Sequence, residues 1–191
     1  MSPLALAGLF AVGLVVMVAL YIVVASYNAI VALRQRIDKA WANIDVVLKQ
    51  RHDQLPNLVA AVRGVMTFER DVLTQVTQAR AAYSPTAPIP DQAATSEATT
   101  SAVRSLFAVV ERYPDIKSQT NVQDLQTEIE RLEAMIADRR ELYNDQVYRY
   151  NTAIAQVPGV VLASILGWKT RLFFAVDPGE IIRPDTSLGA R

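Results

Sequence analysis

The chain has 191 residues, with 19 basic and 19 acidic side chains, no cysteine and 7 glycines. This length supports one domain of ordinary size plus an appendage, and glycine is too sparse for a loop-rich β-sandwich. The lack of cysteine excludes disulfides, cysteine-ligated zinc and thiol catalysis. Balanced charge argues against nucleic acid as a partner, because phosphate binding normally leaves a basic excess.

The first element is an apolar segment, "PLALAGLFAVGLVVMVALYIVVA", at residues 3–25, and no charged side chain precedes Arg34. As a helix it would span roughly 34 Å, enough to cross the hydrocarbon core of a bilayer with some tilt. We therefore predict a transmembrane anchor over residues 1–25, with residues 3–25 in contact with lipid. A cleaved signal peptide is the alternative, but the segment lacks a basic leading region and is longer than the usual apolar core of such peptides.

The flanks of this segment predict its orientation in the cell membrane. Arg34, Arg36 and Lys39 follow it within a few helical turns, whereas no basic side chain precedes it. Cytoplasmic flanks are normally the ones enriched in Lys and Arg. We expect a single-pass protein whose N-terminus is outside and whose remaining chain is cytoplasmic.

Beyond the anchor, apolar side chains recur at steps of three and four, which is typical of one helical stripe. No glycine or proline separates this stripe from the anchor, so the two are expected to form one long rod. The stripe resumes after Pro56 and fades near Tyr83. Its first members are Ile30, Leu33, Ile37, Trp41, Ile44 and Leu48.

Residues 84–101, "SPTAPIPDQAATSEATTS", hold three prolines among Ser, Thr and Ala. We interpret them as a flexible connection, because they offer no apolar face. A short helix around residues 103–110 and a long one from Asn121 to about residue 155 should follow. Residues 171–176, "RLFFAV", could be a strand or extended packing. The predicted fold is all-α: one transmembrane helix continuing into an antiparallel bundle of long helices.

Three blocks stand in order along the chain: "SYNAIVALRQRIDKAWANIDVVLKQRHDQLPNLVAAVRG", centred on Trp41, then "VVERYPDIKSQTNVQDLQTEIERLE" and "RRELYNDQVYRYNTAI". Together they resemble the LemA family of membrane-anchored helical proteins. The resemblance covers residues 26–168 and leaves the tail at 169–191 outside. It implies a single span, a short outward N-terminus and a cytoplasmic helical bundle. It implies no catalytic mechanism and no cofactor, and the roles proposed for the family are interaction or scaffolding at membranes.

His52, the only histidine, lies beside the apolar stripe, between Leu48 and Leu55. A structural role is favoured over a pH-sensitive or catalytic one, because a lone histidine without an arranged partner is a weak start for catalysis. Pro56 cannot donate a hydrogen bond to the His52 carbonyl, which costs about 3 kcal/mol inside a straight helix. We predict a kink there, with Asn57 or water near the released carbonyl.

Tyrosine–asparagine pairs form a second set of candidates. Tyr143–Asn144 and Tyr150–Asn151 are seven residues apart, and Tyr27–Asn28 is a third copy where the chain leaves the apolar segment. Tyr27 fits the aromatic belt of a membrane boundary. Asn144 and Asn151 are expected to cross-link helices and fix their register, as polar residues do in coiled-coil cores. Recognition of a partner is the alternative.

Carboxylates gather along the long helix, but the pattern does not indicate a metal site. Carboxylate sites in helical bundles use Glu-x-x-His, and His52 is in no such motif. Arg131, Arg139 and Arg140 are interleaved with the acids, so an ion-paired surface is favoured. The acids are Glu128, Glu130, Glu133, Asp138 and Glu141.

The sequence contains no phosphate-binding loop, nucleophile elbow or zinc-binding helix motif. We therefore expect no catalytic, cofactor or metal site. The predicted function is a membrane-anchored scaffold or adaptor that recruits unknown protein partners or self-associates as a homo-oligomer. The alternatives are a membrane-associated hydrolase and a membrane-remodelling or envelope-stress sensor.

Overall fold

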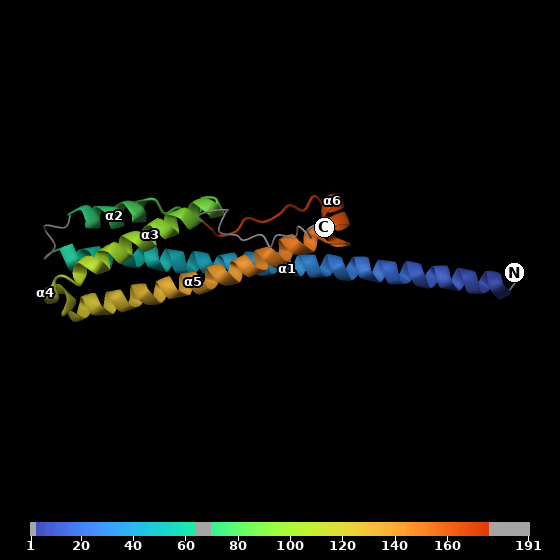
Figure 1. Cartoon of the computed structure of the whole chain (residues 1–191), viewed down its shortest axis with the longest axis horizontal. Coiled ribbons are helices and arrows are strands. Elements are labelled where there is room, and N and C mark those ends of the chain that lie inside the picture. Colours follow the sequence, from blue (N-terminus) through green and yellow to red (C-terminus); the bar gives the residue numbers. More distant parts are fainter. Residues whose placement is uncertain (1–2, 64–69, 176–191) are drawn as a thin grey trace, which may run out of the picture. The chain divides into compact units, whose positions relative to one another are not determined.

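The computed structural model describes residues 3–63 and 70–175, and every regular element within them is an α-helix (Figure 1). The all-α prediction is confirmed. The helices are α1 (Pro3–Arg63), α2 (Arg70–Ala81), α3 (Ile89–Val110), α4 (Pro114–Lys117), α5 (Thr120–Ala155) and α6 (Gly159–Leu166).

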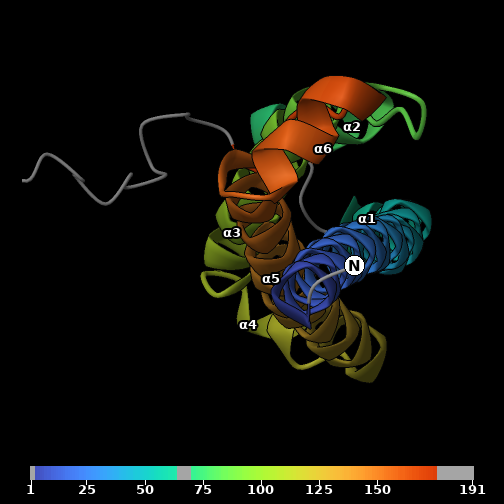
Figure 2. The same ribbon diagram turned by 90° about the vertical axis from the view of Figure 1, so that its right-hand side faces the viewer.

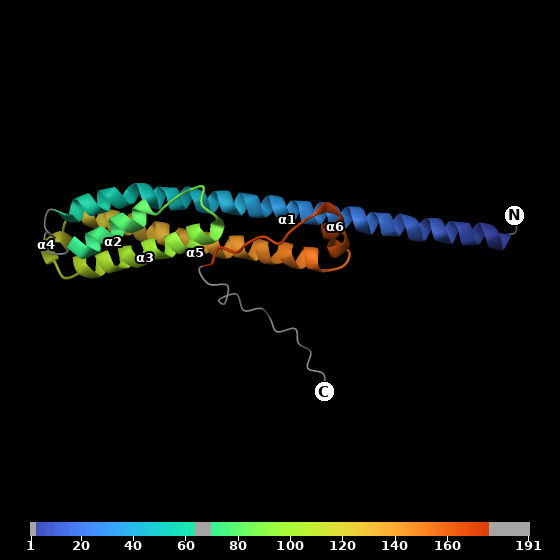
Figure 3. The ribbon, with the colours of Figure 1, turned by 90° about the horizontal axis from the view of Figure 1, so that it is seen from above.

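These residues form two compact units. Unit 1 combines the described residues up to Asn43 with Glu141–Leu172, and unit 2 combines Ile44–Arg140 with the residues from Phe173 onward. The long helices α1 and α5 contribute to both. In unit 2 the second half of α1, then α2, α3 and the first half of α5 lie side by side with alternating directions (Figure 3).

Helix α1 joins two kinds of surface in one element. Its apolar beginning is exposed, with Phe10 at 77% and Val15 at 67%, and α1 is long and apolar enough to cross a membrane. Its later part instead buries a stripe at steps of three and four residues. The stripe comprises Ile30 and Ile37 in unit 1, and Ile44, Leu48, Leu55, Leu58 and Val62 in unit 2.

Pro56 lies inside α1, and the helix continues through it to Arg63. The chain therefore does not break there, because packing of Leu55, Leu58 and Val59 on both sides of the proline outweighs the lost hydrogen bond. The bend itself stays a prediction. Asn57 donates from Nδ2 to Gln54 Oε1 at 3.0 Å, so its amide is engaged with a side chain instead of the His52 carbonyl.

The prediction of a flexible connection over residues 84–101 is wrong from residue 89 onward, because α3 begins at Ile89. Pro88 and Pro90 are tolerated because they stand at the start of α3, where no backbone donor is needed. Gln92 fixes the turn by donating to the carbonyl oxygens of Pro85 and Ala87 at 3.2 and 2.8 Å. Small side chains then face inward and let α3 approach its neighbours, including α2. They are Ala93, Ser96, Thr99 and Ala102.

The long helix α5 begins one residue before the predicted Asn121 and ends at Ala155. The described part of "RLFFAV", residues 171–175, contains no strand, so extended packing is the correct alternative. In unit 1 the short α6 lies crosswise to α1, which Figure 2 views nearly end-on. Gly159 allows the start of α6 to lie close to the end of α5, because a β-carbon at this position would be 2.0 Å from the Ala153 carbonyl oxygen.

Candidate functional site

Unit 1 gathers five of the predicted site residues around a non-helical segment, Trp168–Leu172, which we call the strap. The strap follows α6, whose end is made by Gly167 in a left-handed conformation with φ of 66°. Such a conformation is readily adopted by glycine and ends a helix without steric cost. The five residues are Tyr27, Trp41, Tyr143, Tyr150 and Asn151.

Helix α5 holds the backbone of the strap through side chains. The Tyr143 and Tyr150 hydroxyls donate to the carbonyl oxygens of Leu172 at 2.9 Å and Lys169 at 3.1 Å. Asn151 donates from Nδ2 to the Arg171 carbonyl at 3.0 Å and accepts from the Arg171 N–H at 2.8 Å. The seven-residue spacing places the two tyrosines in line on one helix face, and Asn151 lies next to Tyr150. The three side chains satisfy backbone groups of Lys169, Arg171 and Leu172.

The same strap is tied to α1 by aromatic and ionic contacts. The Trp168 ring stacks on Tyr27 with centroids 5.7 Å apart, and the Arg34 guanidinium lies 5.7 Å from the Trp168 ring. Asp38 and Arg171 form an ion pair at 3.2 Å. Both the aromatic and the cation–π geometry are favourable. The strap therefore fastens α5 to α1 within unit 1.

Trp41 completes this arrangement by contacting Tyr143 edge-on, with ring centroids 5.7 Å apart. Burial raises the pKa of Tyr143 to about 12. The hydroxyl therefore stays protonated at neutral pH and acts as a hydrogen-bond donor, not as a base.

The two remaining asparagines of the Tyr–Asn pairs differ in burial. Asn28 is exposed on α1, and Asn144 is half-buried on α5. Asn151 was predicted to cross-link helices, but it bonds the strap instead. The sequence indicated that Asn151 makes a tertiary contact but not that its partner is the strap, because a non-helical segment has no residue periodicity from which its position could be predicted.

In unit 2, His52 lies beside Tyr83, with ring centroids 4.9 Å apart. Its Nδ1 atom is buried without a hydrogen-bond partner. Burial, followed by the nearby charge of Arg80, lowers the pKa of His52 below its ordinary value. The imidazole is therefore neutral near pH 7. The Tyr83 hydroxyl donates to Asp45 Oδ1 at 3.4 Å and so does not bond the imidazole. This environment supports the structural interpretation of His52.

An open cavity of about 350 Å³ lies next to Pro56. Its lining is mostly aliphatic and includes Val59 and Val76, together with Arg63 and Arg80. Pro56 thus forms part of a surface hollow, while Asn57 is exposed.

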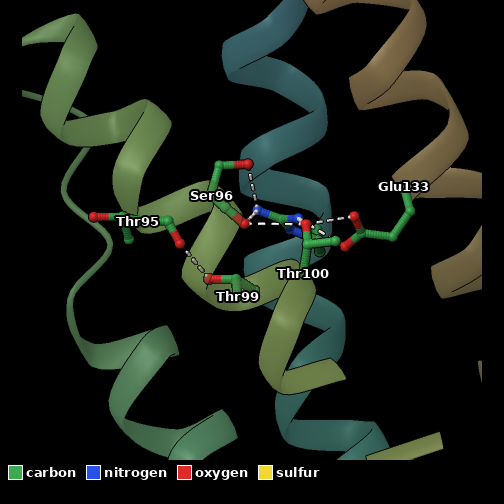
Figure 4. Close-up of polar contacts among 6 residues, drawn as sticks. Thr95, Ser96, Thr99, Thr100 and Glu133 are labelled. Atoms are coloured by element: carbon green, nitrogen blue, oxygen red, sulfur yellow. Dashed lines mark hydrogen bonds and ion pairs between the residues drawn. The ribbon is translucent and has the colours of Figure 1, made fainter. Parts of the chain in front are cut away.

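A buried arginine that sequence analysis missed lies in the core of unit 2. Arg51 is 3% exposed, and its Nη1 donates to Glu133 Oε1 at 2.7 Å and Thr100 Oγ1 at 2.9 Å. Its Nη2 donates to Ser96 Oγ at 2.9 Å. Figure 4 shows these partners, Ser96 and Thr100 on α3 and Glu133 on α5. The side chain joins α1, α3 and α5 by charge-assisted hydrogen bonds.

A sequence signal for Arg51 was present. The apolar stripe runs through residues 44, 48, 55, 58 and 62, and position 51 completes its alternating steps of four and three. A charged residue on a buried stripe requires a partner. On α5 the partner is Glu133, and nearby Glu128 pairs with Arg131 at 2.6 Å. Two of the five acids, Glu133 and Glu128, are thus paired with arginines, and the ion-paired surface stays a prediction for the other three.

The fold and this site define an all-α, membrane-associated helical protein in which polar side chains fasten helices and a strap. The LemA family model matches residues 40–187, which is most of the chain, and the protein belongs to the LemA family. The match extends past Trp168, so the prediction that the family resemblance ends there is wrong. The strap is part of the family region.

Two proteins named Magnetosome protein MamQ 2 and MamQ 1, from Paramagnetospirillum magneticum, are 39% identical to this chain over 77 residues. Magnetosome protein MamQ from Magnetospirillum gryphiswaldense is 35% identical over 77 residues. Each match covers 40% of this chain and 28% of the relative. The similarity therefore concerns a segment, not the whole of the relatives.

Proposed function

We propose that this protein is a single-span membrane scaffold whose helical domain recruits protein partners or a second copy. The observation that carries the proposal is the continuity of α1 from Pro3 to Arg63. One helix exposes an apolar surface suited to lipid and then supplies the buried stripe of unit 2. Anything bound to the bundle is thereby tethered to the membrane through α1.

The side chains that could take part in catalysis are instead used in packing and hydrogen bonds within the fold, which supports a scaffold over a hydrolase. His52 is neutral and packed on Tyr83, and the Tyr143 hydroxyl donates to a backbone carbonyl. Arg51 donates hydrogen bonds to Glu133 and to the hydroxyls of Ser96 and Thr100. Each group is used to hold elements together, which leaves none arranged as a nucleophile and base pair.

Orientation is part of the proposal: residues 3–25 cross the bilayer, the N-terminus is outside, and Arg34, Arg36 and Lys39 mark the cytoplasmic side. The absence of native cysteine makes this testable by single-cysteine labelling. An impermeant maleimide added to intact cells should label Ser2→Cys and leave Ser118→Cys unlabelled until the cells are opened. The reverse pattern would refute the orientation.

Partner recruitment is tested by photo-crosslinking from apolar side chains that the protein leaves exposed. Leu142 on α5 is 60% exposed and Val46 on α1 is 53% exposed. A photoreactive residue at either position should give a discrete adduct in native membranes, whereas exposed Glu130 serves as a polar control on α5. A chain that stays monomeric and gives no adduct at Leu142 or Val46 would refute the scaffold. The MamQ match covers too little of those proteins to extend a magnetosome role to this chain.

A further inference from the structure

Helix α6 packs in the reverse sense to an ordinary surface helix. Its small residues Gly159 and Ala163 are buried, while large apolar side chains point outward. Ile165 is 75% exposed and Val161 is 54% exposed. Val160, Leu166 and the preceding Val157 are exposed as well, at 42%, 46% and 83%.

No charged side chain lies on this surface, although Ser164 on α6 and the preceding Gln156 are polar and exposed. Residues 150–168 contain no charged side chain, and Lys169 is the first to follow. A contiguous apolar patch of this kind marks an interaction site in a soluble domain, because exposing it to water is unfavourable. The patch formed by Val157 and the outward side chains of α6 is here called the α6 patch.

The position of α6 relative to α1 indicates what covers the patch. A β-carbon on Gly159 would lie 3.2 Å from Ile30 Cδ1, so the start of α6 is level with Ile30. Just after the end of α6, Trp168 stacks on Tyr27. Both ends of α6 are therefore level with residues 27–30 of α1, within the same unit.

Residues 27–30 lie two to five positions beyond the apolar run 3–25, which is about 3–8 Å along the helix axis. The headgroup layer on each side of a bilayer is about 5–8 Å thick, from the difference between the whole bilayer and its hydrocarbon core. Figures 1 and 3 both show α6 running across the direction of α1. If α1 crosses the bilayer, α6 lies along the interface.

We propose that the α6 patch is a second membrane contact, inserted at the boundary between the headgroups and acyl chains of the bilayer that α1 crosses. The Tyr27–Trp168 pair is the type of aromatic anchor found at this depth. Arg34 and Lys169 flank Trp168 and supply positive charge for lipid phosphates. The proposal rests on the transmembrane span of the proposed function. A lipid surface is chosen over a second copy because the patch is continuous in depth with the lipid-exposed part of α1.

The consequence is a two-point attachment. An eight-residue helix adds little affinity to a transmembrane anchor, but it fixes how unit 1 is tilted and rotated against the bilayer. The strap that follows α6 then passes this orientation to α5 through Tyr143, Tyr150 and Asn151.

The test uses the full chain in nanodiscs made of zwitterionic and anionic phospholipid. Single cysteines carrying an environment-sensitive fluorophore are placed at Phe10, Ala42 and Ile165, and quenching by lipids with a nitroxide near the headgroup or at mid-chain is measured. Phe10 reports the span. Ala42, exposed on α1, lies about 26 Å beyond residue 25 and reports water. Ile165 should be quenched several-fold more than Ala42, and more strongly by the headgroup-proximal nitroxide than by the deep one.

Each other outcome overturns the proposal in a different way. If Phe10 is quenched and Ile165 behaves like Ala42, the span stands and the α6 contact is refuted. If Ile165 is shielded from both water and lipid quenchers and Ile165→Cys forms a disulfide between copies, a second copy covers the patch. If neither Phe10 nor Ile165 is quenched, the transmembrane span of the proposed function fails too.

Discussion

Because the guanidinium of Arg51 is buried, we predict that removing Glu133 destabilises the protein more than removing Arg51 does. Removing one partner of a fully buried ion pair costs about 3–5 kcal/mol, because the other charge stays desolvated. The Glu133 side chain is 21% exposed, and Ser96 and Thr100 still accept bonds from Arg51. We therefore expect Glu133→Ala to lower the free energy of unfolding by about 2–3 kcal/mol.

Arg51→Met should cost less, about 1–2 kcal/mol, because methionine keeps an apolar stem and the part-exposed Glu133 can be hydrated by water. Replacing both groups by apolar residues, in Arg51→Met with Glu133→Leu, should bring stability back to within about 1 kcal/mol of the native protein. Free energies of unfolding come from denaturant titrations of the full chain in a mild detergent, followed by far-ultraviolet circular dichroism.

The matched control is Glu128→Ala on the same helix, which removes the exposed Glu128–Arg131 pair and should leave stability unchanged. The reasoning would be refuted if Glu133→Ala cost no more than this control. It would also be refuted if the double variant lost the sum of the two single losses, since coupling through the shared charge requires non-additivity.

Three further predictions follow from the other contacts. Asn151→Ala removes both side-chain bonds to the Arg171 backbone, so trypsin should cleave after Arg171 several-fold faster than in the native protein; an unchanged rate would contradict the role of the strap. The pKa of His52 is lower in the folded protein than in the unfolded chain, so the unfolded chain binds this proton more readily. The free energy of unfolding should therefore be highest above about pH 6.5 and should fall as the pH is lowered. His52→Gln should flatten this part of the stability profile, and parallel profiles for the two proteins would rule out a neutral, partly buried imidazole. Gly159→Ala would place a β-carbon 2.0 Å from a backbone oxygen and should lower the thermal midpoint, whereas Gly13→Ala, with nothing within 4 Å of its β-carbon, should not; equal midpoints would show that α6 is not packed closely.

The sequence determined the features that periodicity and composition encode. The apolar run, the long stripe of α1 and the repeat of α5 each follow from residues spaced at three and four positions, because helical packing repeats at that interval. The seven-residue repeat of Tyr143 and Tyr150 correctly marked one face of α5. Local patterns of this kind are readable without knowing the neighbours.

Tertiary structure decided what each face contacts. The Ser-, Thr- and Ala-rich stretch lacks large apolar residues, so it resembles a linker, yet those small side chains are what allow α3 to pack closely. Arg51 is stable in the core only because Ser96, Thr100 and Glu133 come from distant parts of the chain. The strap has no periodic pattern, and only its bonds to α5 reveal its place. These contacts join residues far apart in sequence, and local propensity carries no information about such pairs.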